Sequence, residues 1–276
     1  MNIDVGDAFR SLKKIEYWRC NTTGLCWYIP EDAAGSEALY TQLQQFDWYY
    51  MKNKWEFLVA LSLLNPASRL LEIGVGVGHF MDMAIQAGHT IRGVELNSNA
   101  AIRVRQKGFE VFQADLSQLK HQLSKPCDAI CSFQVLEHVT NPRLFIEGML
   151  GLVKPGGQII LSVPDATFMR RIDPENEELL NQPPHHLTHW DESVFRSLED
   201  IFPVKVKTVC HEPLASYHVK WFATSYLRTL LPPIRRNFKR LIVNRATTLP
   251  LQWLLSVGLR KKIHGHTLLV ELVREP

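Results

Sequence analysis

The feature that most constrains the fold is a regular alternation of short apolar runs with helical segments between residues 69 and 163. The apolar runs, rich in Ile, Val, Leu and Phe, are predicted strands at 69–73, 90–96, 109–114, 128–133 and 158–163. Such alternation is typical of βαβ units around a parallel sheet that helices cover on both faces. Further strands are expected at 204–209 and 267–273, so the sequence predicts an α/β fold.

Four regions are expected along the 276 residues, which suffice for one principal core. They are an N-terminal extension with a helical lid (1–66), the core (67–211), a helical cap inserted at 212–262 and a final core strand (263–276). The lid has an aromatic segment containing Trp48, Tyr49, Tyr50, Trp55 and Phe57. These rings could close over a ligand, but packing into the core is the favoured interpretation.

A glycine-rich segment, Glu72-Ile-Gly-Val-Gly-Val-Gly78, comes directly after the first predicted core strand and before a predicted helix. Without β-carbons, Gly74, Gly76 and Gly78 permit a tight turn and let a ligand approach the backbone closely. Glycines also gather in turns that bind nothing. The glycines therefore mark a candidate ligand site, but they do not identify the ligand on their own.

Two carboxylates end the next two predicted strands. Glu95 lies about twenty residues after the glycines, where a carboxylate can accept two hydrogen bonds from a ribose diol. Asp115 closes the third strand, from which it could accept the exocyclic amine of adenine. A solvated acid for Glu95 and a loop cap for Asp115 are the alternatives.

Together with Glu72, these residues resemble the class I S-adenosylmethionine-dependent methyltransferases. The resemblance continues through Cys127-Asp-Ala-Ile-Cys-Ser-Phe-Gln-Val-Leu-Glu-His138, Leu152-Val-Lys-Pro-Gly-Gly157 and Ile160-Leu-Ser-Val-Pro-Asp165, and it covers about residues 45 to 210. It implies a Rossmann-like fold with a mainly parallel seven-stranded sheet and S-adenosylmethionine as cofactor. The same blocks make NAD a distant competitor.

The resemblance also implies roles for individual residues. Gly74, Gly76 and Gly78 would line the methionine and ribose portion, Glu95 would hold the ribose, and Asp115 would meet adenine. Glu72 would order the glycine loop, and Gln134 and Val135 would flank the adenine or the sulfonium. His138 fits a helix start and a site residue equally well.

Three histidines, His185, His186 and His189, lie in Pro183-Pro-His-His-Leu-Thr-His-Trp190, after the fifth predicted core strand. We expect one of them to act as a general base toward an acceptor oxygen. The alternative is that they only tie the loop to the sheet. A metal on these three residues is weighed and set aside, because the two prolines make the segment loop-like.

Cysteine usage predicts neither a disulfide nor a metal. The five cysteines form no even framework, so reduced thiols are expected. Cys20 and Cys26 resemble a remnant of the zinc ribbon that precedes some related methyltransferases. A structural zinc site needs about four ligands and no second cysteine pair is present at suitable spacing, so no zinc is predicted.

Charge and hydropathy narrow the classes of acceptor and the cellular location that we expect for the protein. Lys plus Arg exceed Asp plus Glu by only 31 to 28, which argues against nucleic acid as a partner. No secretory signal or membrane-spanning run is recognised, so a cytoplasmic protein is expected. The 212–262 segment mixes apolar and basic residues; a cap packed on the core is favoured over peripheral membrane contact.

The function predicted from these features is S-adenosylmethionine-dependent methylation, with oxygen as the expected acceptor atom, of a small molecule or a glycan or lipid precursor. Because the sulfonium already activates the methyl group, transfer is an in-line displacement that needs few catalytic side chains. An RNA or other nucleic-acid methyltransferase is the alternative enzyme, supported by the basic stretch at 228–245. A noncatalytic scaffold that binds the cofactor is the alternative from another class.

Overall fold

The structure, a computed structural model, describes the whole chain except residues 1–8, 10–11, 47–48, 121, 124 and 233–235. Its centre is a seven-stranded sheet in the order β5-β4-β3-β6-β7-β10-β9. The strands are β3 (Arg69–Ile73), β4 (Thr90–Val94), β5 (Val111–Phe112), β6 (Cys127–Phe133), β7 (Val153–Pro164), β9 (Val204–Pro213) and β10 (His264–Arg274). Neighbouring strands from β5 to β7 are parallel, and β10 is antiparallel to both β7 and β9. The predicted mainly parallel seven-stranded sheet is confirmed.

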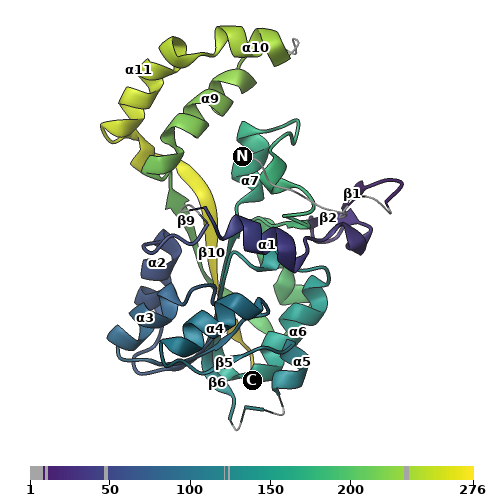
Figure 1. The fold of residues 1–276 in the computed structure, drawn as a ribbon, viewed down its shortest axis with the longest axis vertical. Helices are drawn as coiled ribbons and strands as arrows, with labels where there is room; N and C mark the ends of the chain where they lie inside the picture. The colour runs from purple at the N-terminus through teal and green to yellow at the C-terminus, as the bar shows by residue number, and fades with distance from the viewer. Residues whose placement is uncertain (1–8, 10–11, 47–48, 121, 124, 233–235) are drawn as a thin grey trace.

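Helices cover both faces of this sheet (Figure 1). One face packs against α2 (Trp55–Leu63), α3 (His79–Gln86) and α4 (Ser98–Gln106), and the other against α5 (Leu116–Leu119), α6 (Pro142–Leu152) and α8 (Glu192–Ser197). Successive strand residues serve opposite faces: Ile160 packs toward α2 and α3, whereas Leu161 packs toward α6. Each such buried side chain contributes roughly 1.5–3 kcal/mol. The sheet is therefore a rigid platform for the turns at its edge.

All strands of the main sheet except β3 differ from their predicted bounds, and β7 and β5 illustrate how. β7 begins at Val153, earlier than expected, and its pairing with β6 has an irregularity between Val153 and Gln158. The Lys154-Pro-Gly-Gly157 turn is thus accommodated within the ladder. β5 is shorter than the predicted strand, with only Val111 and Phe112 assigned to it at the edge of the sheet.

The sequence pattern predicts helices in the N-terminal extension, but the structure also contains strands there. It contains α1 (Glu37–Leu43) but also a hairpin of β1 (Glu16–Arg19) and β2 (Cys26–Ile29). β2 also pairs with β8 (Thr188–His189), which belongs to the histidine segment, to form a separate three-stranded sheet. The sequence analysis did not predict these strands because they are very short, and β8 becomes a strand only by pairing with β2, which is distant in the sequence. Trp48, part of the predicted aromatic segment, lies outside the described residues.

The insertion before the last strand forms a helical cap that projects beyond one end of the main sheet (Figure 1). It comprises α9 (Val219–Thr229), α10 (Arg236–Ile242) and α11 (Arg245–Ser256). Phe222 of α9 and Leu255 of α11 pack with Phe168 of α7 (Ala166–Ile172) in a third core cluster. Arg235 lies outside the described part of the insertion.

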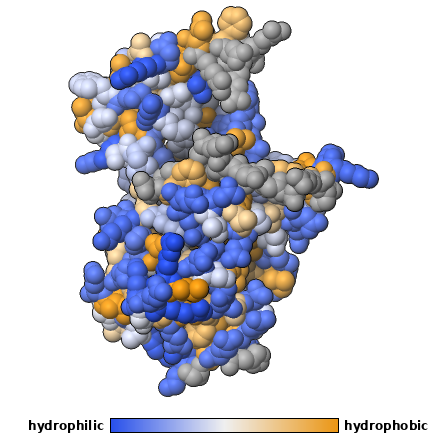
Figure 2. All heavy atoms as spheres, in the orientation of Figure 1, coloured by the Kyte–Doolittle hydropathy of each residue, from blue (hydrophilic) through white to orange (hydrophobic). Residues whose placement is uncertain are grey.

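The outer side of the cap leaves large apolar side chains exposed, and Figure 2 shows hydrophobic residues at this end of the molecule. The exposed residues on or next to α10 and α11 are Phe238, Leu241, Ile242, Leu249, Trp253, Leu254, Val257 and Leu259. Within the described residues, no helix combines the length and apolar character needed to cross a membrane. The cap therefore has a packed inner side and an apolar outer side.

Candidate active site

The glycine-rich turn joins β3 to α3 at the edge where the parallel strands end. Gly74 and Gly76 have φ angles of 80° and 53°, and Gly78, at 78°, is the N-cap of α3. A Cβ on Gly74 would lie 2.4 Å from Cγ2 of Val135, and one on Gly76 would lie 2.5 Å from a ring carbon of Tyr50. Both positions require glycine for conformation and for space.

Glu95 lies just after β4 at the same edge and holds the glycine turn in place. Its carboxylate accepts hydrogen bonds from the backbone N–H of Gly76 at 2.9 Å and of Asn97 at 2.8 Å. Burial raises the pKa of Glu95, against the opposing effect of these bonds. Because each carboxylate oxygen has two acceptor positions, the group can also accept from a ligand.

Asp115 stands immediately before α5 but its side chain does not cap that helix. The loop-cap interpretation of this residue therefore receives no support from a capping bond. Asp115 lines the same cavity as Glu95 and the glycine turn. Its carboxylate is in place to accept a hydrogen bond from a ligand.

Glu72 is a buried carboxylate beneath the turn, only 2% exposed. Within the described part of the chain, its Oε2 atom has no hydrogen-bond partner, and the residue lines the cavity. Burial, reinforced by Glu95, raises the pKa of Glu72 well above its ordinary value. A buried acceptor without a donor is costly, so this oxygen is suited to a donor or cation from a ligand.

Gln134 and Val135, which come directly after β6, complete this side of the cavity. Gln134 has a positive φ of 56°, uncommon for a residue with a side chain, and its backbone N–H donates to the carbonyl of Ser162 at 2.9 Å. The resulting turn sets Val135 against Gly74. All eight residues predicted to bind a cofactor lie at the edge of the sheet where the parallel strands end. Gly78 lies there as the N-cap of α3.

One continuous cavity of about 1180 Å³ extends from the glycine turn to the histidine segment. Its far side includes Glu137, His138, His185 and His186, with Tyr217, His218 and Trp221 contributed by the cap and the turn before it. Ligand pockets commonly measure about 300–1,000 Å³. This cavity is therefore large enough for two ligands side by side.

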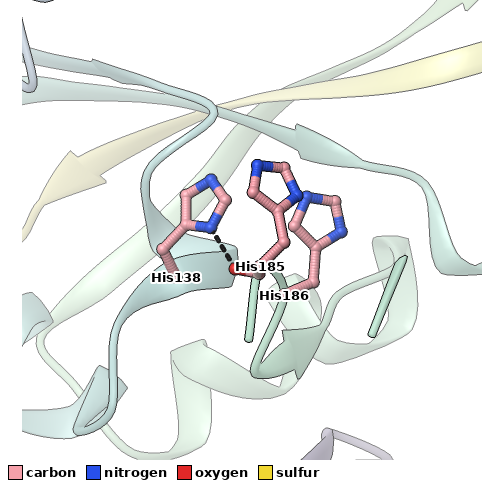
Figure 3. A group of neighbouring side chains, drawn as sticks. All are labelled: His138, His185 and His186. Atoms are coloured by element: carbon pink, nitrogen blue, oxygen red, sulfur yellow. Dashed lines mark hydrogen bonds between the residues drawn. The ribbon is translucent and has the colours of Figure 1, made fainter. Parts of the chain in front are cut away.

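Three histidines meet at the far side of the cavity, and we call His138, His185 and His186 the imidazole cluster (Figure 3). Their ring centroids are 4.6 Å apart for His138 and His185, 5.0 Å for His138 and His186, and 4.5 Å for His185 and His186. The sequence-based prediction placed His189, not His138, with His185 and His186. His138 joins them because a 3-10 turn at Leu136–His138 lies beside the histidine segment.

His189 occupies a different environment from the cluster. Its Nδ1 atom is 2.6 Å from the hydroxyl of Tyr17, and its Nε2 atom is 2.8 Å from the carbonyl oxygen of Asn181. Both ring nitrogens are thus engaged by the hairpin and the loop. His189 is absent from the residues that line the cavity within the described chain. This position argues against His189 as the general base.

Burial dominates the electrostatics of the imidazole cluster. It lowers the pKa of His138 to about 3, that of His186 well below its ordinary value, and that of His185 in the same direction. It also raises the pKa of the adjoining Glu137 carboxyl to about 8. The three imidazoles are therefore neutral at pH 7.

The aromatic residues before the core divide between the two expected roles. Tyr49 and Tyr50 line the cavity, together with Tyr40 of α1. Trp55 packs instead against the core cluster under α2 and α3. Tyr40, Glu137 and the cap residues were not singled out from the sequence. Glu137 lay within the Val-Leu-Glu-His block, whereas no pattern indicated which cap residues would face the cavity.

The methyltransferase domain family matches residues 42–223, well over half of the chain. The chain belongs to this family. The predicted recognition is confirmed, and with it S-adenosylmethionine as the cofactor of the domain. The matched segment contains the glycine turn, both strand-end acids and the whole imidazole cluster.

Curated relatives of this family member include two ubiquinone biosynthesis O-methyltransferases. The mitochondrial protein of Dictyostelium discoideum is 38% identical over 78 residues, covering 27% of this chain and 24% of that protein. The protein of Dechloromonas aromatica is 32% identical over 109 residues, covering 37% of this chain and 46% of that protein. The chain thus spans less than half the length of these relatives.

Solved structures resemble the fold at low sequence identity. A coclaurine N-methyltransferase bound to N-methylheliamine and SAH aligns with a TM-score of 0.51 at 16% identity, covering 79% of this chain and 72% of that one. The cyclopropane synthase MmaA2 from Mycobacterium tuberculosis aligns with a TM-score of 0.50 at 17% identity, covering 79% and 83%. These likenesses confirm the Rossmann-like fold of the methyltransferase family.

Proposed function

We propose that this family member is an S-adenosylmethionine-dependent methyltransferase that methylates an oxygen atom of a small molecule. The observation that carries the proposal is the cavity that joins the glycine turn to the imidazole cluster. One end offers backbone and carboxylates to a nucleoside, and the other offers neutral imidazoles to an acceptor. Both substrates of a methyl transfer could therefore meet in one cavity.

The residues at the cofactor end fit S-adenosylmethionine, which carries positive charge on its sulfonium and its ammonium group. Glu72 offers a buried, unpartnered Oε2 to such a charge, while Gly74 and Gly76 leave space that a Cβ would fill. When bound, the cofactor supplies a methyl group that its sulfonium has already activated. The protein then has to align the acceptor and remove its proton.

An oxygen acceptor is favoured by the relatives and by the far end of the cavity. Both ubiquinone biosynthesis relatives are O-methyltransferases, although each alignment covers less than half of either protein. A hydroxyl acceptor must lose a proton, and neutral His185 or His186 is our candidate general base. Their lowered pKa keeps them in the form that can accept a proton, but it also weakens them as bases.

A glycan or lipid precursor is the finer proposal for the acceptor, with peripheral membrane contact through the cap. Residues 213–262 contain ten Lys and Arg residues and no Asp or Glu. The exposed apolar side chains of α10 and α11 accompany these charges. Apolar residues beside cationic ones suit the surface of an anionic membrane. A lipid-linked acceptor could then reach the cavity from the membrane.

The experiment that tests the proposal measures SAH release from S-adenosylmethionine with a panel of phenolic, glycan and lipid-linked hydroxyl acceptors. We expect turnover that depends on one acceptor class and falls in a His185→Gln variant. Transfer to RNA alone would favour the nucleic-acid alternative. Saturable cofactor binding without turnover of any acceptor would favour the noncatalytic scaffold.

A further inference from the structure

We propose that the imidazole cluster is a binding site for a divalent transition metal of the zinc class, with His138, His185 and His186 as its three ligands. One ring nitrogen from each residue lies within 4.8 Å of the other two. Zinc binds imidazole nitrogen at about 2.0–2.1 Å, which places tetrahedral ligand atoms about 3.4 Å apart. The rings therefore need to approach one another by at most about 1.4 Å.

The cluster is held in the manner of metal-binding histidines. Nδ1 of His138 lies 2.5 Å from the carbonyl oxygen of His185, and Nδ1 of His185 lies 2.9 Å from that of Leu180. Nδ1 of His186 lies 3.3 Å from the amide oxygen of Asn181. Because all three partners are acceptors, each Nδ1 carries the proton, and each Nε2 has a free lone pair for a metal.

Several electron-rich atoms around the cluster have no hydrogen-bond donor among the described residues. Nε2 of His185 and both carboxyl oxygens of Glu137 are buried without a hydrogen bond in the described part of the chain. Nε2 of His138 lies 3.7 Å from Oε1 of Glu137, too far for a hydrogen bond. A cation bound to the cluster would compensate these buried lone pairs, and this is the second observation in favour of the site.

Three protein ligands leave a fourth position open, as in catalytic zinc sites. All three histidines line the cavity, so this position can face an acceptor. With a metal bound, the cation would take the place of a histidine base: an acceptor hydroxyl held at the open position would have its pKa lowered and would lose its proton to solvent water. Its oxygen would then bond to the methyl carbon as the carbon–sulfur bond breaks and the electron pair stays on sulfur. This role rests on the proposed function, whereas metal binding itself does not.

The test uses the full chain, stripped of metal with a chelator and then titrated with Zn²⁺ and, separately, with Co²⁺. Metal retained after gel filtration gives the stoichiometry, and the visible absorption bands of tetrahedral Co²⁺ report the ligand geometry. His185→Gln and His186→Gln remove ligands. His189→Gln is the matched control, because His189 is buried in the same segment but lies outside the cluster.

We expect one metal per chain, tetrahedral Co²⁺ bands, and affinity at least ~100-fold weaker in His185→Gln and His186→Gln than in His189→Gln. Circular dichroism identifies any variant that fails to fold. A well-folded original chain that retains no zinc and gives no cobalt bands would overturn the proposal, as would equal affinity in all variants. S-adenosylmethionine binding, measured on the same metal-free samples, separates this failure from a failure of the proposed function.

Discussion

The cofactor end and the acceptor end of the cavity are built in different ways. The cofactor end comes from the ends of β3, β4, β5 and β6 and the turns that follow them, within residues 72–135. The acceptor end draws on the lid, a 3-10 turn, the histidine segment and the cap, which are separated by up to about 180 residues of chain. The first depends on the strand order alone, while the second depends on how added segments pack on the core.

This difference predicts that changes at the two ends affect different measurements. Parallel strands must bring their carboxyl ends to one edge, so the cofactor site is fixed as soon as the sheet forms. The imidazole cluster requires the histidine segment to dock against the turn after β6. Changes at the first end should weaken cofactor binding, and changes at the second should impair transfer while leaving that binding intact.

The largest effect is expected for Gly74→Ala. Its Cβ would meet Val135 at 2.4 Å in a backbone conformation with φ of 80°, which would distort the turn. We expect S-adenosylmethionine affinity to fall at least ~100-fold, with roughly 1–3 kcal/mol of lost stability. Gly88→Ala is the matched control, because φ is 86° there but nothing lies within 4 Å of the added Cβ. Equal cofactor affinity in the two variants, measured by calorimetry, would contradict this account.

His185→Gln should impair methyl transfer and leave S-adenosylmethionine affinity nearly unchanged, the reverse of what we expect for Gly74→Ala. Loss of the imidazole should lower kcat by about 10²–10⁴-fold, the usual contribution of acid–base catalysis, with little change in cofactor affinity. Steady-state kinetics with a responsive acceptor measures the first effect and calorimetry measures the second. His189→Gln, which alters a histidine outside the cavity, should keep most of the activity. A comparable loss in both variants would mean that the segment acts only through its packing.

A smaller effect is expected at the outer side of the cap. Trp253, 64% exposed on α11, would bury its ring in a membrane, so Trp253→Ser should weaken binding to anionic vesicles about tenfold. Leu144→Ser is the control, since Leu144 is 62% exposed on α6. Co-sedimentation with vesicles containing phosphatidylserine measures both. If the original chain does not sediment with these vesicles, the proposed membrane contact is wrong and the cap only lines the cavity.

The smallest effect concerns the pH dependence of stability at His218. Burial lowers the pKa of His218 from its ordinary 6.5 to about 4, so between these values the unfolded chain binds a proton that the folded chain does not. Stability from this residue is present above about pH 6.5 and is lost as the pH falls toward 4. His218→Gln should therefore unfold less readily in acid relative to pH 7 than the original chain. Urea unfolding at both pH values tests this, with the exposed His264→Gln as control.

The contrast between the two ends also explains how much could be predicted from the sequence. Glu95 and Gly76 lie just after adjacent strands, so hydrophobic alternation and strand-end chemistry sufficed to bring them together. His138 and His185 meet because the histidine segment docks on the turn at Leu136–His138, where the Leu187 N–H donates to the carbonyl of Glu137 at 2.8 Å. Such long-range contacts, like the pairing of the very short β8 with β2, leave little trace in local sequence patterns. The exposed side of α11 was likewise undetermined, because a helix apolar on several sides does not indicate which side faces the core.

The most direct test of the central claim is a calorimetric titration of the purified chain with S-adenosylmethionine, alongside Glu95→Ala and with NAD as a control ligand. Glu95→Ala removes the acceptor for the Gly76 N–H and the proposed acceptor for the ribose, so we expect saturable binding to weaken about 100-fold, with no response to NAD. Glu110→Ala, at an exposed acid nearby, should bind as the original chain does. A well-folded original chain that does not bind S-adenosylmethionine, or binds it equally well without Glu95, would contradict the account.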